Sequence, residues 1–259
     1  MIVSTALAHA PGALIQDAAG GEQQPLALVQ AAPKRARVPR PLRAAAYWSG
    51  ARGRCRCIIY LEPRRGTALR TALDGFLRAS AEQLGPTEAH QYHPHSSMTG
   101  FIDLTACEID GMAARIAVHL HEAVAGRRGG LAAPRVKGVA AVDGYPHAGT
   151  HKVELQLDTP PAFRAIVDEV ARAAPEAAIR PKRMGHISLA YRNKHVDSGT
   201  VVSADHAQAL AALARAFLAD PAIADPAQNL WDIAFYELSF KSASLATPHR
   251  FTQIARWRL

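Results

Sequence analysis

A short pattern of histidine, any residue, serine and a hydrophobic residue occurs twice in the chain. The two copies begin at residues 95 and 186 and read His95-Ser96-Ser97-Met98 and His186-Ile187-Ser188-Leu189. Each copy lies in a stretch with the character of a β-strand, and side chains two residues apart in a strand point to the same face. Two such strands side by side would bring two imidazoles and two hydroxyls into one cleft.

This set of groups suits acid–base chemistry on a bound phosphate. Histidine has an unperturbed pKa of about 6.5, so it exists in both protonation states near neutral pH. One imidazole can take a proton while the other gives one, and the hydroxyls can donate hydrogen bonds to phosphate oxygens. Such a pair predicts a bell-shaped dependence of rate on pH.

The elements that would position these groups follow in a regular order. Hydrophobic spacing and turn residues predict helices over 67–84, around Met112 to Gly126, from Pro161 onward and around 210–217. Strands are expected at 56–61, 91–103, 135–142, 151–157, 183–191, 231–240 and 251–258. Each motif follows a helix and a short loop, which predicts a duplicated unit with two lobes that face each other across a cleft.

The N-terminal residues differ in composition from the rest. Residues 1–45 are rich in Ala, Pro, Gln and Arg, and their prolines interrupt any long helix. We interpret 1–45 as a flexible basic tail and 46–259 as a single bilobal domain. Residues 1–57 hold eight basic and two acidic residues, which is most of the net charge of +8. The nearly neutral remainder fits a small or short substrate better than a long duplex.

Composition also bounds the class and location of the protein. With 49% hydrophobic residues the chain of 259 residues can build a core, and no apolar run is long enough for a transmembrane helix. The three cysteines, Cys55, Cys57 and Cys107, have no framework spacing and indicate a reducing compartment. We therefore expect a cytoplasmic monomer with no membrane partner.

The motifs and their context resemble the two-histidine (2H) phosphoesterase superfamily, which includes 2′,3′-cyclic nucleotide and RNA 2′,3′-cyclic phosphodiesterases. The resemblance covers about residues 54–259 and includes Leu61-Glu62-Pro63 at the end of an early strand and Thr99-Gly100-Phe101 after the first motif. It implies a bilobal α+β fold with two antiparallel sheets facing a central cleft. It also implies metal-independent opening of a 2′,3′-cyclic phosphate of a nucleotide or short RNA end, commonly to the 2′-phosphate. His95 and His186 would be the acid–base pair, and Ser97 and Ser188 would hold the phosphate.

Five further residues are candidates for substrate contacts. Thr99 lies on the face of His95 if that strand is regular, Tyr145 in a turn suits base stacking, and three cations lie near the predicted cleft: Lys182, Arg183 and Lys241. Which histidine is the base is open at this point. We expect His186 to activate water and His95 to protonate the leaving oxygen.

Two other functions remain open from the sequence. The spacing of His90, His93 and His95 is compatible with a zinc hydrolase in which three histidines hold the metal. A non-catalytic module that binds RNA or nucleotides in the same cleft is the other alternative, and the basic tail would then add salt-dependent phosphate contacts.

Overall fold

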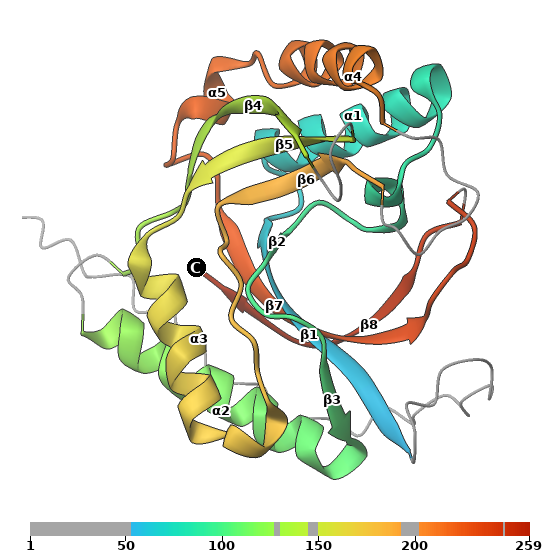
Figure 1. Cartoon of the computed structure of the whole chain (residues 1–259). Coiled ribbons are helices and arrows are strands. Elements are labelled where there is room, and N and C mark those ends of the chain that lie inside the picture. The colour runs from blue at the N-terminus through green and yellow to red at the C-terminus, as the bar shows by residue number, and fades with distance from the viewer. Residues whose placement is uncertain (1–52, 127–129, 145–149, 193–201, 246) are drawn as a thin grey trace, which may run out of the picture. The chain divides into compact units, whose positions relative to one another are not determined.

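The computed structural model describes residues 53–126, 130–144, 150–192, 202–245 and 247–259. The predicted tail at 1–45 lies outside these ranges. Within them the chain forms two antiparallel sheets with helices on the outside, which confirms the α+β fold class (Figure 1). No helix of the described part has the length and apolar character needed to cross a membrane.

The larger sheet is built on the early strand β1. Its order is β2-β1-β7-β8, and β3 also pairs with β1. Every pairing in this sheet is antiparallel. The strands are β1 (Arg54–Pro63), β2 (Ser96–Ser97), β3 (Ile102–Thr105), β7 (Trp231–Phe240) and β8 (Arg250–Arg258).

The smaller sheet has three antiparallel strands in the order β4-β5-β6. These are β4 (Arg135–Asp143), β5 (His151–Asp158) and β6 (His186–Ala190). Both sheets contribute to one hydrophobic core, whose large, fully buried side chains include Phe76, Phe163, Trp231 and Phe235.

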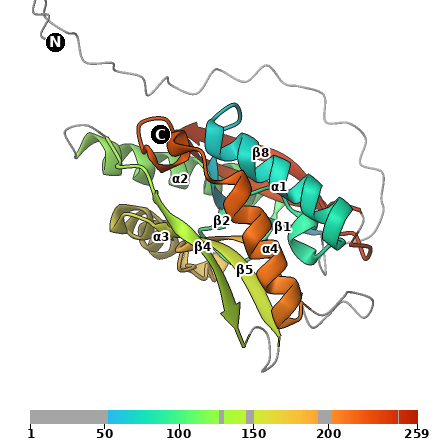
Figure 2. The same cartoon turned by 90° about the horizontal axis from the view of Figure 1, so that it is seen from above.

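The helices begin at polar caps or at proline and bury one apolar face each. The Thr67 side chain accepts a hydrogen bond from the Arg70 amide at the start of the first helix, and Thr105 and Glu108 form a capping box at the start of the second. The α-helices are α1 (Ala68–Leu84), α2 (Ala106–Ala125), α3 (Pro161–Ala173), α4 (Ala204–Phe217) and α5 (Pro221–Ala224), and the 3₁₀ helices are η1 (Glu88–Gln91) and η2 (Pro175–Ala177). Helices α1 and α4 pack against each other on one side of the molecule, and α2 and α3 on another (Figures 1 and 2).

The two motif strands occupy equivalent places in the two sheets. In each case the motif strand pairs with the strand that precedes the intervening helix, in the orders β1-α1-β2 and β5-α3-β6. Ser97 lies opposite Tyr60 in one sheet, and Ser188 lies opposite Glu154 in the other. This arrangement agrees with the expected two-lobed unit.

Main-chain hydrogen bonds join the two lobes directly beside the motifs. The amide of Gly100 donates to the carbonyl of Arg180 and the amide of Lys182 donates to the carbonyl of Met98, both at 2.8 Å. Thr99 and Pro181 form an isolated antiparallel bridge between these bonds. The distance between the two motifs is therefore fixed by backbone pairing as well as by side-chain packing.

The strand predicted at 91–103 is much shorter in the structure. Residues Glu88–Gln91 form η1, β2 is only two residues long, and His95 precedes it. Pro94 lacks the N–H that a ladder requires, and the main chain from Met98 to Gly100 pairs with the opposite lobe. His95 therefore lies at the entry to a strand, whereas His186 is the first residue of β6.

Candidate active site

The four motif side chains line one cavity of about 490 Å³. His95 and Ser97 come from β2 and the segment before it, and His186 and Ser188 come from β6. All four residues are half-buried, while the intervening and following hydrophobic residues are buried in the core: Met98, Ile187 and Leu189. The alternation of strand side chains thus turns the polar members of both motifs toward the same space.

The charged side chains that line this cavity are of one sign. Four basic residues line it, and no described lining residue is Asp or Glu; the basic residues are Lys152, Arg180, Lys182 and Arg183. Clefts lined by one sign of charge attract ligands of the opposite sign. The cavity is therefore suited to an anionic ligand such as a phosphate ester.

His95 is held in one orientation by its neighbours. Its Nδ1 atom lies 2.8 Å from the carbonyl oxygen of His93, and its ring stacks on Tyr60 with the ring centroids 3.7 Å apart. A carbonyl oxygen only accepts, so Nδ1 carries the hydrogen and Nε2 keeps its lone pair. Burial and the neighbouring His93 lower the pKa of His95 to about 3, although the His93 carbonyl and Glu62 act in the opposite direction. His95 is therefore neutral near pH 7.

His186 has a different electrostatic environment. Its Nδ1 atom lies 3.9 Å from a carboxylate oxygen of Glu154, which also pairs with the Lys152 ammonium at 2.7 Å. Burial lowers the pKa of His186, Glu154 raises it, and Lys152 and Arg183 lower it further. Glu154 therefore stabilises the protonated form of His186, although burial outweighs it and the pKa of His186 is lowered overall.

A buried carboxylate lies behind the first motif, and the sequence did not identify it as part of the site. Glu62 is 1% exposed; it accepts hydrogen bonds from Tyr236 Oη at 2.8 Å and Arg256 Nη2 at 3.2 Å, and its Oε1 lies 3.4 Å from His93 Nε2. Burial raises the pKa of Glu62, but His93, Arg256 and Tyr236 outweigh burial and lower it to about 2. Glu62 thus lies within ion-pair distance of His93, the residue whose carbonyl contacts the ring of His95.

The five candidate substrate contacts fall in different places. Lys182 and Arg183 are exposed and line the cavity. Thr99 also lines it but is fully buried, and its Oγ1 accepts a hydrogen bond from the Ile59 amide at 3.2 Å. Lys241 does not line the cavity and lies near His249, whose pKa is lowered by burial and then by that cation. Tyr145 lies outside the described residues.

Phe101 and Arg180 were not predicted as site residues, yet both line the cavity. Phe101 directly follows the segment that pairs with the opposite lobe, and Arg180 lies on the paired segment of that lobe. Their approach results from pairing between residues about 80 positions apart in the chain, which hydrophobic periodicity does not reveal.

The three histidines proposed as zinc ligands do not converge. His90 Nδ1 accepts a hydrogen bond from the Thr87 amide at 2.8 Å, and its Nε2 lies 3.0 Å from Ser80 Oγ. His93 faces Glu62, and His95 Nδ1 faces a carbonyl. No group of three or more His, Cys, Asp or Glu side chains suited to a metal ion occurs in the described part of the chain. The zinc-hydrolase alternative therefore lacks its ligand set.

No family model matches the chain, and no curated protein matches it. Among solved structures it is similar to Escherichia coli LigT in its apo form, with a TM-score of 0.41 and 13% identity, covering 80% of this chain and 98% of that one. It is also similar to E. coli LigT complexed with 3′-AMP, with a TM-score of 0.40 and 11% identity over the same shares of the two chains. These values leave the activity to be inferred from the residues of the chain itself.

Proposed function

We propose that the protein is a phosphoesterase of the two-histidine class that opens a 2′,3′-cyclic phosphate of a nucleotide or RNA end to a phosphomonoester. The observation that carries the proposal is the single cavity lined by both His-x-Ser motifs and by four basic residues, with no described acidic lining residue. A cyclic phosphodiester has one negative charge, one phosphorus to be attacked and one leaving oxygen. The two imidazoles can act on the attacking water and on the leaving oxygen, and the two serine hydroxyls can bind the charged phosphate.

In the proposed reaction His95 is the general base. Its imidazole is neutral, and its free Nε2 can accept a proton from the attacking water while Nδ1 stays bound to the His93 carbonyl. The water oxygen forms a bond to phosphorus, and the bond from phosphorus to one ribose oxygen breaks. This assigns the base role to His95, the reverse of the expectation from the sequence.

His186 then donates a proton to the leaving ribose oxygen. Glu154 favours the protonated imidazole, and a bound phosphate would add a second negative charge that raises the pKa of His186 further. Departure of the 3′ oxygen gives the 2′-phosphate, the product implied by the resemblance to the superfamily. His95 ends with the proton of water and His186 without its own, so a proton exchange with solvent restores the starting state.

Ser97 and Ser188 would hold the phosphate between the two histidines. Their hydroxyls can donate hydrogen bonds to the non-bridging phosphate oxygens. The basic residues that line the cavity would stabilise the negative charge of the phosphate. The protein side chains thereby supply the base, the acid and the phosphate contacts, and the proposed reaction uses neither a metal nor a cofactor.

The direct test is incubation of the full-length protein with each of the four nucleoside 2′,3′-cyclic phosphates in the presence of EDTA. Chromatography against 2′- and 3′-monophosphate standards separates the two products. We expect the 2′-monophosphate to accumulate with multiple turnovers. Tight binding of the cyclic nucleotides without any product would contradict the proposal and support the nucleotide-binding module instead.

A further inference from the structure

We propose that a groove continues from the catalytic cavity across Phe101 and Arg180 and binds the nucleotide on the 5′ side of the cyclic phosphate, so that the substrate is an oligonucleotide end. This inference rests on the proposed function and specifies its substrate. A 2′,3′-cyclic phosphate sits at the 3′ end of an RNA chain, so every further nucleotide lies on its 5′ side. A free cyclic nucleotide would leave the groove unused.

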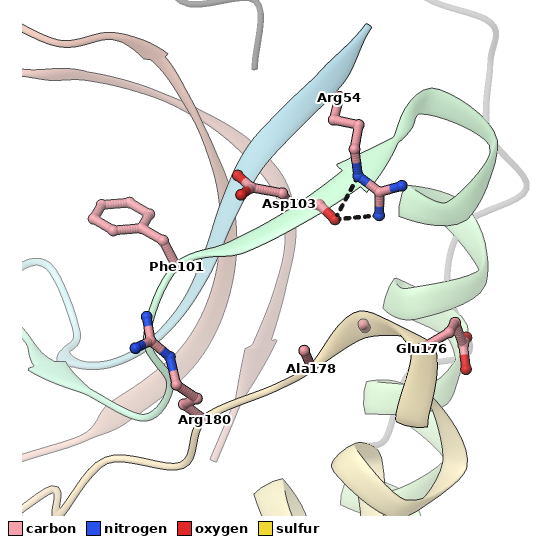
Figure 3. Close-up of a pocket in the computed structure, with 7 residues that line it drawn as sticks. Arg54, Phe101, Asp103, Glu176, Ala178 and Arg180 are labelled. Carbon is pink, nitrogen blue, oxygen red and sulfur yellow. Dashed lines mark hydrogen bonds between the residues drawn. The ribbon is translucent and has the colours of Figure 1, made fainter. Parts of the chain in front are cut away.

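The groove follows from two cavities with common walls. A second cavity of about 450 Å³ lies next to the catalytic one, and Phe101 and Arg180 line both. Figure 3 shows Phe101 and Arg180 at one side of this second cavity and Arg54 and Glu176 at the other. The two cavities therefore share the side chains of Phe101 and Arg180 as walls, and this is where the proposed groove passes from one to the other.

The opposite lobe holds the main chain of Arg180 in place, while its guanidinium is exposed and available to a ligand. Its main-chain carbonyl accepts a hydrogen bond from the Gly100 amide, and a Cβ atom added to Gly100 would lie 3.6 Å from its Nε and Nη2 atoms. The guanidinium thus lies along the Gly100 backbone. Within the described ranges it has no carboxylate partner and is exposed. Lys182, two residues further along the segment that pairs with the opposite lobe, also lines the catalytic cavity and is exposed.

The two acidic residues of the second cavity each pair with an arginine that does not line it. Asp103 pairs with Arg56 Nε at 3.3 Å, and Glu176 pairs with Arg115 Nη1 at 3.4 Å. The side chain of Arg54 donates to the main-chain carbonyl of Asp103, as the dashed lines in Figure 3 show. The charge of Arg180 at the junction therefore remains available for a phosphodiester, to which a guanidinium can donate two parallel hydrogen bonds.

Phe101 supplies the other half of a nucleotide site. Its ring is half-buried beside the junction, with the Arg56 guanidinium carbon 5.6 Å from the ring centroid. Aromatic rings next to cations are the usual platform for single-stranded nucleic acid, because every base can stack on them. Phe101 and Arg180 together present a base platform and a phosphate contact at the exit from the catalytic cavity.

The experiment compares adenosine 2′,3′-cyclic phosphate with a triadenylate that ends in the same cyclic phosphate. We expect the wild type to prefer the trinucleotide, and Arg180→Gln and Phe101→Leu each to lower the ratio of the two kcat/KM values by about tenfold. Arg180→Lys should restore part of the ratio because it keeps the charge. Arg164→Gln is the matched control, since Arg164 is exposed on α3 and pairs with Asp168. For the trinucleotide, Arg180→Gln should also flatten the plot of log kcat/KM against log salt by about 0.7.

The outcomes separate this inference from the proposed function. If the wild type hydrolyses both substrates and the ratio of the two kcat/KM values is the same in all variants, the proposed groove is contradicted and the proposed function stands. If neither substrate is hydrolysed, the proposed function fails, and binding of a fluorescent triadenylate 3′-phosphate then tests the groove by anisotropy. In that assay Arg180→Gln weakens binding about tenfold if the groove binds RNA, and an unchanged affinity overturns it.

Discussion

The Nδ1 atom of His95 lies 2.8 Å from the main-chain carbonyl oxygen of His93, two residues earlier in the chain. This contact fixes both the ring orientation and the tautomer of His95, because a carbonyl can only accept the proton of Nδ1. The ring nitrogen left with a lone pair is Nε2. The free protein therefore already presents a neutral imidazole as an acceptor on one side of the cavity, while His186 on the other side is adjacent to Glu154.

This asymmetry predicts the pH dependence of kcat/KM, which reports groups of the free protein. His95 must be neutral, so activity is lost only as the pH falls through its pKa of about 3. His186 must be protonated, and its pKa lies below the ordinary 6.5. We expect kcat/KM to fall by about tenfold per pH unit above a midpoint lower than pH 6.5, because the protonated fraction of His186 falls by that factor.

Steady-state kinetics between pH 5 and 9 on adenosine 2′,3′-cyclic phosphate would measure this profile. The kcat profile should be displaced to higher pH than that of kcat/KM, because the bound phosphate raises the pKa of His186. A kcat/KM that is flat or rising over the whole range would contradict the assignment of the acid.

The two serines should act on binding of the phosphate rather than on proton transfer. We expect Ser97→Ala and Ser188→Ala each to lower kcat/KM by about tenfold or more, the loss of one hydrogen bond to a charged group. Ser239→Ala is a suitable control, because Ser239 is exposed and its hydroxyl donates to the Arg250 carbonyl. If kcat/KM of Ser97→Ala and Ser188→Ala equals that of the Ser239→Ala control, the two serines do not bind the phosphate.

Glu62 should contribute to stability as well as to the site. Glu62→Gln leaves Arg256 and Arg70 beside a neutral group in a buried position, and we expect the free energy of unfolding to fall by about 3 kcal/mol. Urea denaturation followed by circular dichroism measures this change. Glu82→Gln, on the exposed face of α1, should have an unfolding midpoint close to that of the wild type.

The stabilisation that Glu62 contributes should also depend on pH. The pKa of Glu62 is lowered from 4.5 to about 2 in the folded protein, so its contribution is complete above pH 4.5 and is lost as the pH falls toward 2. The stability difference between wild type and Glu62→Gln should therefore shrink over that range. A difference that is independent of pH would show that the carboxylate charge is not what stabilises this region.

The cysteines give a simple check of the fold. Cys55 and Cys57 are buried in β1, whereas Cys107 is exposed at the start of α2. Ellman's reagent should react rapidly with one thiol in the native protein and with three after denaturation. Cys107→Ser should abolish the rapid reaction. Rapid reaction of a second thiol would indicate that β1 is less protected than the structure shows.

Much of the fold could be predicted from local pattern. The helices at Ala68–Leu84 and Pro161–Ala173 and the strands at Arg135–Asp143 and Trp231–Phe240 lie within a few residues of the predicted spans. Their signals are local: apolar side chains at helical spacing and turn residues at the ends. The strand at 91–103 was overestimated because Pro94 and pairing with the opposite lobe interrupt it.

The site was only partly accessible to the same reasoning. The paired motifs predicted that His95, Ser97, His186 and Ser188 belong together, and the structure places all four on one cavity. Glu62 and Arg180 could not be found in this way. Glu62 reaches Tyr236 and Arg256 only because β1 pairs with β7 and β7 with β8, and Arg180 reaches Phe101 only because Thr99 bridges to Pro181. Such contacts depend on strand order, which a single sequence does not specify.

The most direct test of the central claim is hydrolysis of adenosine 2′,3′-cyclic phosphate by wild type, His95→Asn and His186→Asn, each with EDTA present and each checked for folding by circular dichroism. We predict turnover by the wild type and a loss of kcat of about 10²-fold or more in each variant, as expected when a general acid or base is removed. Wild-type turnover that persists unchanged in either folded variant would contradict the assignment of the two histidines as an acid–base pair.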